Sequence, residues 1–220
     1  MTPPEPLPHV SRPDAGTTLI SEWIVGTPAR QRMAADALLS EWRELSARFR
    51  PEGFLQLSCF AGADGRVLLS HAQWTDDDAH LAFVREHRPD MVNRIDRDVP
   101  GIERPGLARY EALRSVALGA GPADVVGLVR AEARTAKEAR SWADTVAGRL
   151  RDESPAGISA AHLLLSKDGK HALLYALGTS RHGSPDLPAT AEGGVRVHAP
   201  QYYRLLGSVR GPEKDNTPRR

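Results

Sequence analysis

The chain has 220 residues, of which 40% are hydrophobic and 26% charged, and its formal net charge is +1 at pH 7. This length suits two domains of about 100 residues, and the composition is ordinary for a globular protein. Basic and acidic residues are interleaved, which argues against nucleic-acid binding, and no apolar run reaches the ~20 residues that a membrane span needs. The single cysteine, Cys59, excludes an internal disulfide, favours a cytoplasmic protein and is expected to be a buried structural thiol.

The first half begins with residues 1–17, which carry no signal-peptide pattern and predict a disordered leader. Apolar periodicity and turn residues predict the elements that follow. In chain order these are a strand over 18–25, a helix over 28–48, a hairpin over 53–74, a helix from 75 that Pro89 disrupts, a helical turn over 91–95 and a strand over 107–116.

The second half follows a Gly/Pro-rich linker over 118–123, and it ends in a polar tail over 211–220 that is expected to be disordered. The segment after its hairpin, from 178 to 194, is too rich in Gly, Pro and Ser to predict a second helix. Its expected elements are a strand over 125–133, a helix over 136–151, a hairpin over 157–178 and a strand over 201–209.

The two hairpins, 53–74 and 157–178, resemble one another. Each begins at a glycine, turns at an Asp-Gly pair and returns as an apolar strand, but only the first ends in a tryptophan. The order β-α-β-β-α-β is that of the ferredoxin-like split unit. We therefore predict an α+β chain with tandem ferredoxin-like domains over 18–117 and 124–210. Their sheets pack face to face as an intramolecular dimeric α+β barrel, because each sheet has helices on only one face.

The string from Ser70 to His80, SHAQWTDDDAH, carries a family resemblance. With the Gly-Phe that starts the hairpin and the Val-Pro-Gly before the last strand, it resembles the antibiotic biosynthesis monooxygenases, and within them the small quinone-forming enzymes of aromatic polyketide pathways. The resemblance implies a pocket between sheet and helices, an anthrone-like phenolic polyketide and dioxygen as substrates, and no metal or organic cofactor. It covers residues 18–116 well and 124–209 weakly.

The resemblance implies candidate site residues in the first half. Trp74, which shares a strand face with Ser70, would stack on the substrate and donate its indole N–H, or else would be a core tryptophan that seals the sheet. Ser70 stands where those enzymes carry an asparagine, and it would bind a substrate oxygen. His80 stands where they carry a tyrosine, and it would be a general base or a surface histidine. An arginine that stabilises the oxyanion corresponds to Arg94, or Asn93 occupies that position.

The other aromatic residues are expected to have structural roles. Trp23 is expected in the barrel core or between the halves, and Trp42 and Trp142, which lie on comparable helices, are expected in the core. Tyr175 is expected to serve the contact between the two sheets. The second half has Leu174 and Gly178 in place of Ser70 and Trp74, which predicts a scaffold without such a site. No histidine cluster with metal-ligand spacing occurs, so we expect no metal site.

Two functions remain open after these observations. One is a cofactor-independent monooxygenase that oxidises an anthrone-like phenol to a quinone in one pocket of the first half. The other is a non-catalytic polyketide-binding or cyclisation-assisting accessory protein, because fold likeness alone does not settle function. Haem degradation, known in the wider superfamily, ranks low because the first strand has no asparagine. We expect a fused pseudodimer that is a monomer or a homodimer.

Overall fold

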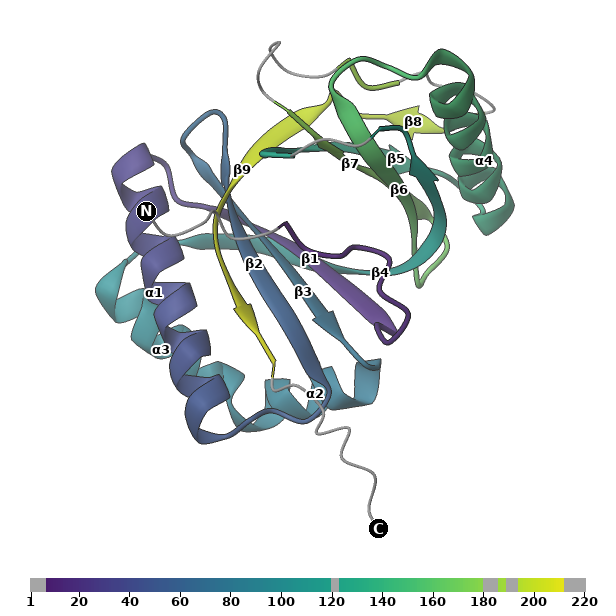
Figure 1. Cartoon of the computed structure of the whole chain (residues 1–220). Helices are drawn as coiled ribbons and strands as arrows, with labels where there is room; N and C mark the ends of the chain where they lie inside the picture. The colour runs from purple at the N-terminus through teal and green to yellow at the C-terminus, as the bar shows by residue number, and fades with distance from the viewer. Residues whose placement is uncertain (1–6, 120–122, 180–185, 189–193, 212–220) are drawn as a thin grey trace.

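The computed structural model describes residues 7–119, 123–179, 186–188 and 194–211, and these form an α+β fold (Figure 1). The described helices and strands are, in chain order, β1 (Thr17–Ile24), α1 (Pro28–Arg48), β2 (Phe54–Gly62), β3 (Val67–Trp74), α2 (Asp77–Glu86), α3 (Arg88–Asp98), β4 (Glu103–Ala117), β5 (Val125–Glu132), α4 (Ala136–Glu153), β6 (Ile158–Ser166), β7 (His171–Gly178), β8 (Arg196–Val197) and β9 (Gln201–Arg210).

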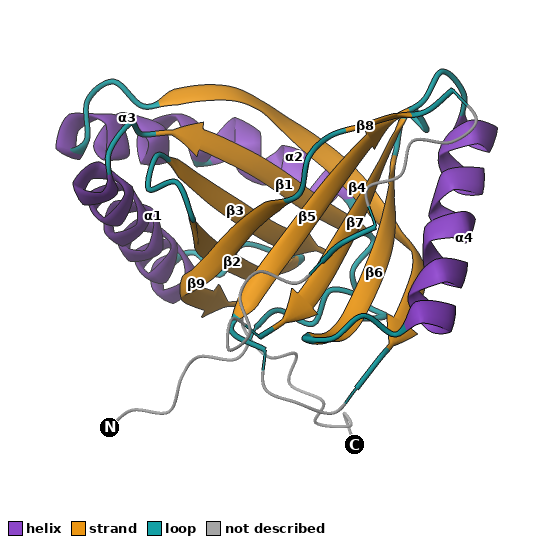
Figure 2. Cartoon of the chain, turned by 90° about the horizontal axis from the view of Figure 1, so that it is seen from above, coloured by secondary structure: helices purple, strands orange, loops and turns teal. Residues whose placement is uncertain are grey.

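The strands form one antiparallel sheet in the order β7-β6-β4-β1-β3-β2-β9-β5-β8. Because β5 also pairs with β7, the row of strands returns on itself, and among the described strands only the two-residue β8 lies outside it. The two halves of the chain meet at two places, where β4 pairs with β6 and where β2 pairs with β9. Helices α1, α2 and α3 flank the strands on one side and α4 flanks them on the other (Figure 2).

Local sequence explains where the predicted helices and hairpins begin and turn. Thr27 accepts a hydrogen bond from the N–H of Arg30 and precedes a proline in the first turn of α1. Gly65 and Gly169 turn the two hairpins with φ of +70° and +72°, a conformation that favours glycine. Both hairpins are therefore confirmed.

No helix in the described part of the chain is long and apolar enough to cross a membrane.

Two elements are longer than their predictions. The helical turn expected over 91–95 is the helix α3, Arg88–Asp98, because Pro89 lies in its first turn, where a missing N–H costs no hydrogen bond. The strand expected over 107–116 is β4, Glu103–Ala117. Its first part pairs with β1 and its second part with β6, so two partners extend it beyond the local apolar pattern.

Three apolar clusters stabilise the fold. One packs α1, α2 and α3 on the first half of the sheet, and a second packs α4 on the other half. The third, which we call the inner core, gathers the side chains that point away from the helices, including Ile20, Phe60, Tyr110 and Tyr175. Tyr175 lies in this inner core, with its ring 5.3 Å from that of His71 on β3, although the strands form one sheet and not the two separate sheets that were expected.

Two further packing predictions have opposite outcomes. Cys59 is fully buried, and burial raises the pKa of its thiol to about 12, so the expected structural thiol is confirmed. The inner position expected for Trp23 is wrong. Trp23 shares the face of β1 that carries Leu19 and lies in the cluster beneath the helices, because alternation places that face outward.

The disordered leader is a wrong prediction for residues 7–16. Val10 is only 1% exposed and belongs to the inner core. The side-chain amide of Gln73, which is buried on β3, donates to the carbonyls of His9 and Val10 at 3.2 and 3.1 Å. The segment is ordered because it supplies acceptors to a buried amide, a need that its own polar and proline-rich composition does not reveal. Residues 1–6 lie outside the described residues.

Replacing Val10 by alanine is expected to lower the free energy of unfolding by about 2 kcal/mol, because a fully buried valine loses two methyl groups from the inner core. Urea denaturation measures this change. Leu206→Ala, at an exposed position of β9, is the control and is expected to change stability by less than about 0.5 kcal/mol. Equal small losses in both variants would contradict the packing of the leader.

Several predicted segments fall partly or wholly outside the described residues. These are the middle of the linker, most of the Gly/Pro/Ser-rich segment after β7, and nearly all of the tail. The undescribed ranges are 120–122, 180–185, 189–193 and 212–220.

Candidate functional site

A cavity of about 180 Å³ lies in the first half, between the sheet and the helices α1, α2 and α3. Its walls are mainly apolar and aromatic, and the lining side chains that carry a polar group are Ser21, Trp23, Trp42, Ser70, Trp74, His80, Arg88 and Arg104. A surface depression of about 1110 Å³, bordered by the N-terminal segment and residues 50–56, contains none of these side chains. We therefore take the smaller cavity as the candidate site.

Alternation along β3 points three of its side chains into the cavity. Ser70, Ala72 and Trp74 line it, whereas His71 is buried on the opposite face and Gln73 contacts the N-terminal segment there. The shared face of Ser70 and Trp74, predicted from the sequence, is confirmed. Trp74 itself stays a candidate for ligand binding.

Trp74 is 1% exposed and lies in an aromatic cluster. Its ring centroid is 5.4 Å from that of Phe54 and 5.3 Å from that of Phe83. Its indole Nε1 is buried and has no hydrogen-bond partner among the described residues. A buried N–H without an acceptor costs about 1–3 kcal/mol.

His80 reaches the cavity from the second turn of α2. The helix begins at Asp76, whose carboxylate accepts from the N–H of Ala79 at 2.8 Å, so the predicted acidic helix start is confirmed. The His80 side chain is buried beside Trp74, with ring centroids 5.4 Å apart, and its Nδ1 lies 3.0 Å from Nη2 of Arg109. Burial, assisted by the charge of Arg109, lowers the pKa of His80 to about 4, so the imidazole is neutral at pH 7.

Arg104, at the start of β4, is a lining cation that the sequence reasoning missed. Its Nη2 lies 2.7 Å from Oδ1 of Asp96, and its guanidinium carbon is 4.4 Å above the ring of Trp23. Its Nε is buried and has no hydrogen-bond partner among the described residues. A second arginine, Arg88, lines the cavity from an exposed position, which places it at the mouth.

Alternation alone would group Arg104 with Ala108 and Tyr110, which face the inner core. A register shift in the pairing of β4 with β1, between Glu22 and Ile24, places Arg104 on the cavity side instead.

The structure does not bring Arg94 and Asn93 to the cavity. Met91 and Ile95 form the buried face of α3, so Asn93 and Arg94 lie on other faces of the helix. Asn93 is exposed, and Arg94 forms an ion pair with Glu41 of α1, with Nη2 2.7 Å from Oε2. Neither residue therefore belongs with the cavity lining.

Ser70 lines the cavity, but its hydroxyl donates to the carbonyl of Ser21 at 3.4 Å. Ser21 in turn donates to the carbonyl of Gly106 at 3.0 Å. While these bonds hold, both hydroxyl groups have used their single hydrogen, so toward the cavity they can accept a hydrogen bond but cannot donate one. Within the described ranges, no group of three or more His, Cys, Asp or Glu side chains could hold a metal ion.

The fold is similar to that of several solved structures. An anthrone oxidase-like protein is 14% identical, with 93% of this chain and 97% of that chain covered and a TM-score of 0.66. A proposed monooxygenase from Lactobacillus acidophilus NCFM is 9% identical, with coverage of 89% and 96% and a TM-score of 0.53. No protein-family model and no curated protein matches the sequence. At these identities the likeness establishes the fold.

Proposed function

We propose that the protein oxidises a small phenolic or enolic aromatic compound of the anthrone type to a quinone, with dioxygen as oxidant and without a metal or organic cofactor. The cavity of the first half is the proposed site. The observation that carries the proposal is that Trp74 and Arg104, two side chains that line one aromatic cavity, each hold a buried N–H donor (Nε1 and Nε) without a partner among the described residues. The similarity to an anthrone oxidase-like fold supports it.

The chemistry follows from these donors. Loss of an acidic C–H proton turns the keto compound into a delocalised carbanion with negative charge on oxygen. The carbanion gives electrons to dioxygen, one oxygen atom becomes the new ketone, and the other leaves as water with the two hydrogens of the oxidised CH₂ group. N–H donors fixed around the enolate oxygen favour the anion and so favour its formation. Trp74 would provide such a donor and a stacking surface.

The cavity volume limits the ligand. About 180 Å³ is below the usual range of ligand pockets, which is roughly 300–1,000 Å³. One or two fused rings fit without rearrangement. A third ring would have to lie at the mouth, where Arg88 is exposed, or require lining side chains to move.

A second candidate function is binding without catalysis, and one observation favours it. His80 is the only lining side chain that could accept a proton, and its pKa of about 4 makes it a weak base at neutral pH. The protein would then hold a polyketide for another enzyme to act on. A monooxygenase with this cavity requires a substrate whose C–H proton is acidic enough to be lost to water, or to be lost with little help from a protein base.

One assay separates these two functions. The pure protein is mixed with 1,8-dihydroxyanthrone under air, with a chelator and without flavin or nicotinamide, and quinone absorbance is followed against a protein-free sample. A rate above the spontaneous oxidation is expected. Quenching of the tryptophan fluorescence by the same compound under nitrogen, together with no rate enhancement under air, would replace the enzyme by the binding protein.

The proposal also includes the tandem origin of the fold. The first half has the strand order β4-β1-β3-β2 and the second half has β9-β5-β7-β6, so corresponding strands occupy corresponding places. In the second half Leu174 and Gly178 stand in place of Ser70 and Trp74, and Leu174 is fully buried in the core under α4. The chain would thus be a fused pseudodimer with its site in the first half.

A further inference from the structure

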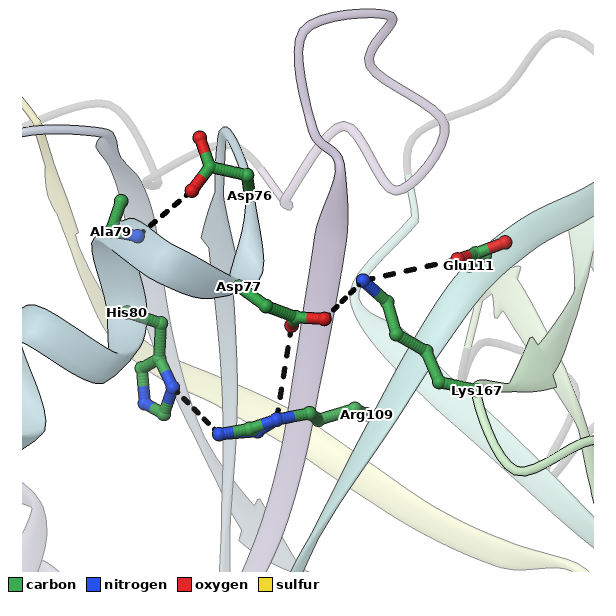
Figure 3. Close-up of polar contacts among 7 residues, drawn as sticks. All are labelled: Asp76, Asp77, Ala79, His80, Arg109, Glu111 and Lys167. Atoms are coloured by element: carbon green, nitrogen blue, oxygen red, sulfur yellow. Dashed lines mark hydrogen bonds and ion pairs between the residues drawn. The ribbon is translucent and has the colours of Figure 1, made fainter.

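The Nδ1 atom of His80 faces a group that can only donate. Nη2 of Arg109, on β4, lies 3.0 Å from it (Figure 3). A guanidinium has five N–H donors, no acceptor and a permanent charge, so Nδ1 must be the acceptor in this contact. If Nδ1 carried a proton instead, two donors would face each other at hydrogen-bond distance.

Arg109 is held in place by the second half of the chain. Its Nε lies 3.8 Å from Oδ1 of Asp77, and Oδ2 of the same carboxylate lies 2.5 Å from Nζ of Lys167 (Figure 3). Lys167 belongs to the turn between β6 and β7, and its backbone N–H donates to the carbonyl of Arg109 at 3.0 Å. Burial raises the pKa of Asp77, but the positive charges of Lys167 and Arg109 outweigh it and keep the carboxylate ionised.

We infer that Arg109 is a positioning residue that fixes His80 as the Nε2–H tautomer, so that His80 offers the cavity a hydrogen-bond donor suited to an enolate or phenolate oxygen. A neutral imidazole whose Nδ1 accepts carries its proton on Nε2. His80 is therefore a further N–H donor beside Trp74 and Arg104, and it does not remove the C–H proton. The identity of the ligand oxygen rests on the proposed function, whereas the tautomer does not.

The second half of the chain thereby helps to position the side chains of the site. Its turn supplies Lys167, which orders Asp77 and, through it, the arginine that contacts His80. The side chains of Arg109, Asp77 and Lys167 are only about 26–31% exposed, so salt screens the attraction between their charges less than it screens fully exposed pairs. The second half thus acts on the chemistry of the cavity without lining it.

Nuclear magnetic resonance of ring-¹⁵N-histidine protein at pH 7, without ligand, tests the tautomer. Long-range correlations from the ring carbon-bound protons separate an unprotonated from a protonated nitrogen, and loss of the signals in His80→Gln assigns them. The expected result is an unprotonated Nδ1 and a protonated Nε2. A protonated Nδ1 in the wild-type protein would overturn the inference, whatever the outcome of the anthrone assay.

Substitution at position 109 tests the role of the arginine. Arg109→Met removes every donor, and we expect a mixture of both His80 tautomers. Arg109→Lys keeps a side chain that has N–H donors and no acceptor, and it is expected to show the same His80 tautomer as the wild type. Lys167→Met leaves Arg109 in place but removes its support, and a partial change is expected. A wild-type tautomer in a folded Arg109→Met protein would show that another group sets the proton, and so would refute the positioning role.

Discussion

Replacing Trp74 by phenylalanine is expected to lower the rate constant of cofactor-free anthrone oxidation by roughly 10²–10³-fold, the usual cost of losing one donor to a developing oxyanion. The indole N–H is buried and has no partner among the described residues, and the Trp74 side chain lines the cavity. Phenylalanine keeps the contacts with Phe54 and Phe83 in part but carries no donor. Single-turnover measurement of quinone formation gives the rate constant.

Two controls separate the donor from the ring. Trp142→Phe makes the same change at a buried tryptophan on α4, in the other half, and is expected to cost stability but not rate. Benzothienylalanine at position 74 replaces the N–H by sulfur and keeps the bicyclic shape. Its rate is expected to match that of the phenylalanine variant. A wild-type rate with benzothienylalanine would show that Trp74 only fills space.

Acid is expected to destabilise the fold well above the pH at which its carboxylates titrate. Burial, with a smaller effect of His162, lowers the pKa of His71 to about 3, and burial, with a smaller effect of His9, lowers that of His162 to about 4. The unfolded chain binds these protons near pH 6.5, so the unfolded state gains protons first and stability falls as the pH drops from about 6.5 toward 4. At pH 5 each of these two histidines lowers the free energy of unfolding by about 2 kcal/mol relative to its value at neutral pH.

His71→Leu is the informative variant. Both ring nitrogens of His71 are buried without hydrogen-bond partners in the described part of the chain, so leucine removes two unsatisfied groups as well as a titrating one. Urea denaturation at pH 7 is expected to show that His71→Leu is at least as stable as the wild type. Between pH 7 and pH 5 the variant is expected to lose about 2 kcal/mol less free energy of unfolding than the wild type loses.

The neighbouring variant Tyr175→Phe serves as the control for this measurement. Its ring lies 5.3 Å from that of His71, and its hydroxyl is also buried and unpartnered among the described residues. Tyr175 does not titrate between pH 5 and 7. The change in the free energy of unfolding between pH 7 and pH 5 is therefore expected to be the same in Tyr175→Phe as in the wild type. An unchanged pH dependence in His71→Leu would mean that His71 does not cause the acid sensitivity.

The sequence carried enough information for the local structure and for one wall of the cavity. Alternation placed Ser70 and Trp74 on one face of β3, and an acidic helix start placed His80 one turn further on. Those assignments depend only on residues close in the chain, whose periods of 2 and 3.6 are fixed by backbone geometry. Arg94 and Asn93, which the resemblance implied for the oxyanion position, are not among the residues that line the cavity, because Met91 and Ile95 form the buried face of α3.

Long-range pairing decided the rest. Arg104 reaches the cavity because the pairing of β4 with β1 shifts register between Glu22 and Ile24, and Val10 is ordered because buried Gln73 needs acceptors. Arg109, Asp77 and Lys167 are far apart in the chain and meet only where β4 lies beside β6. By itself the sequence determined which residues share a face. The tertiary structure decided which charges face one another, because burial and partner distance set the protonation of His80, and neither is a property of the neighbouring residues in the chain.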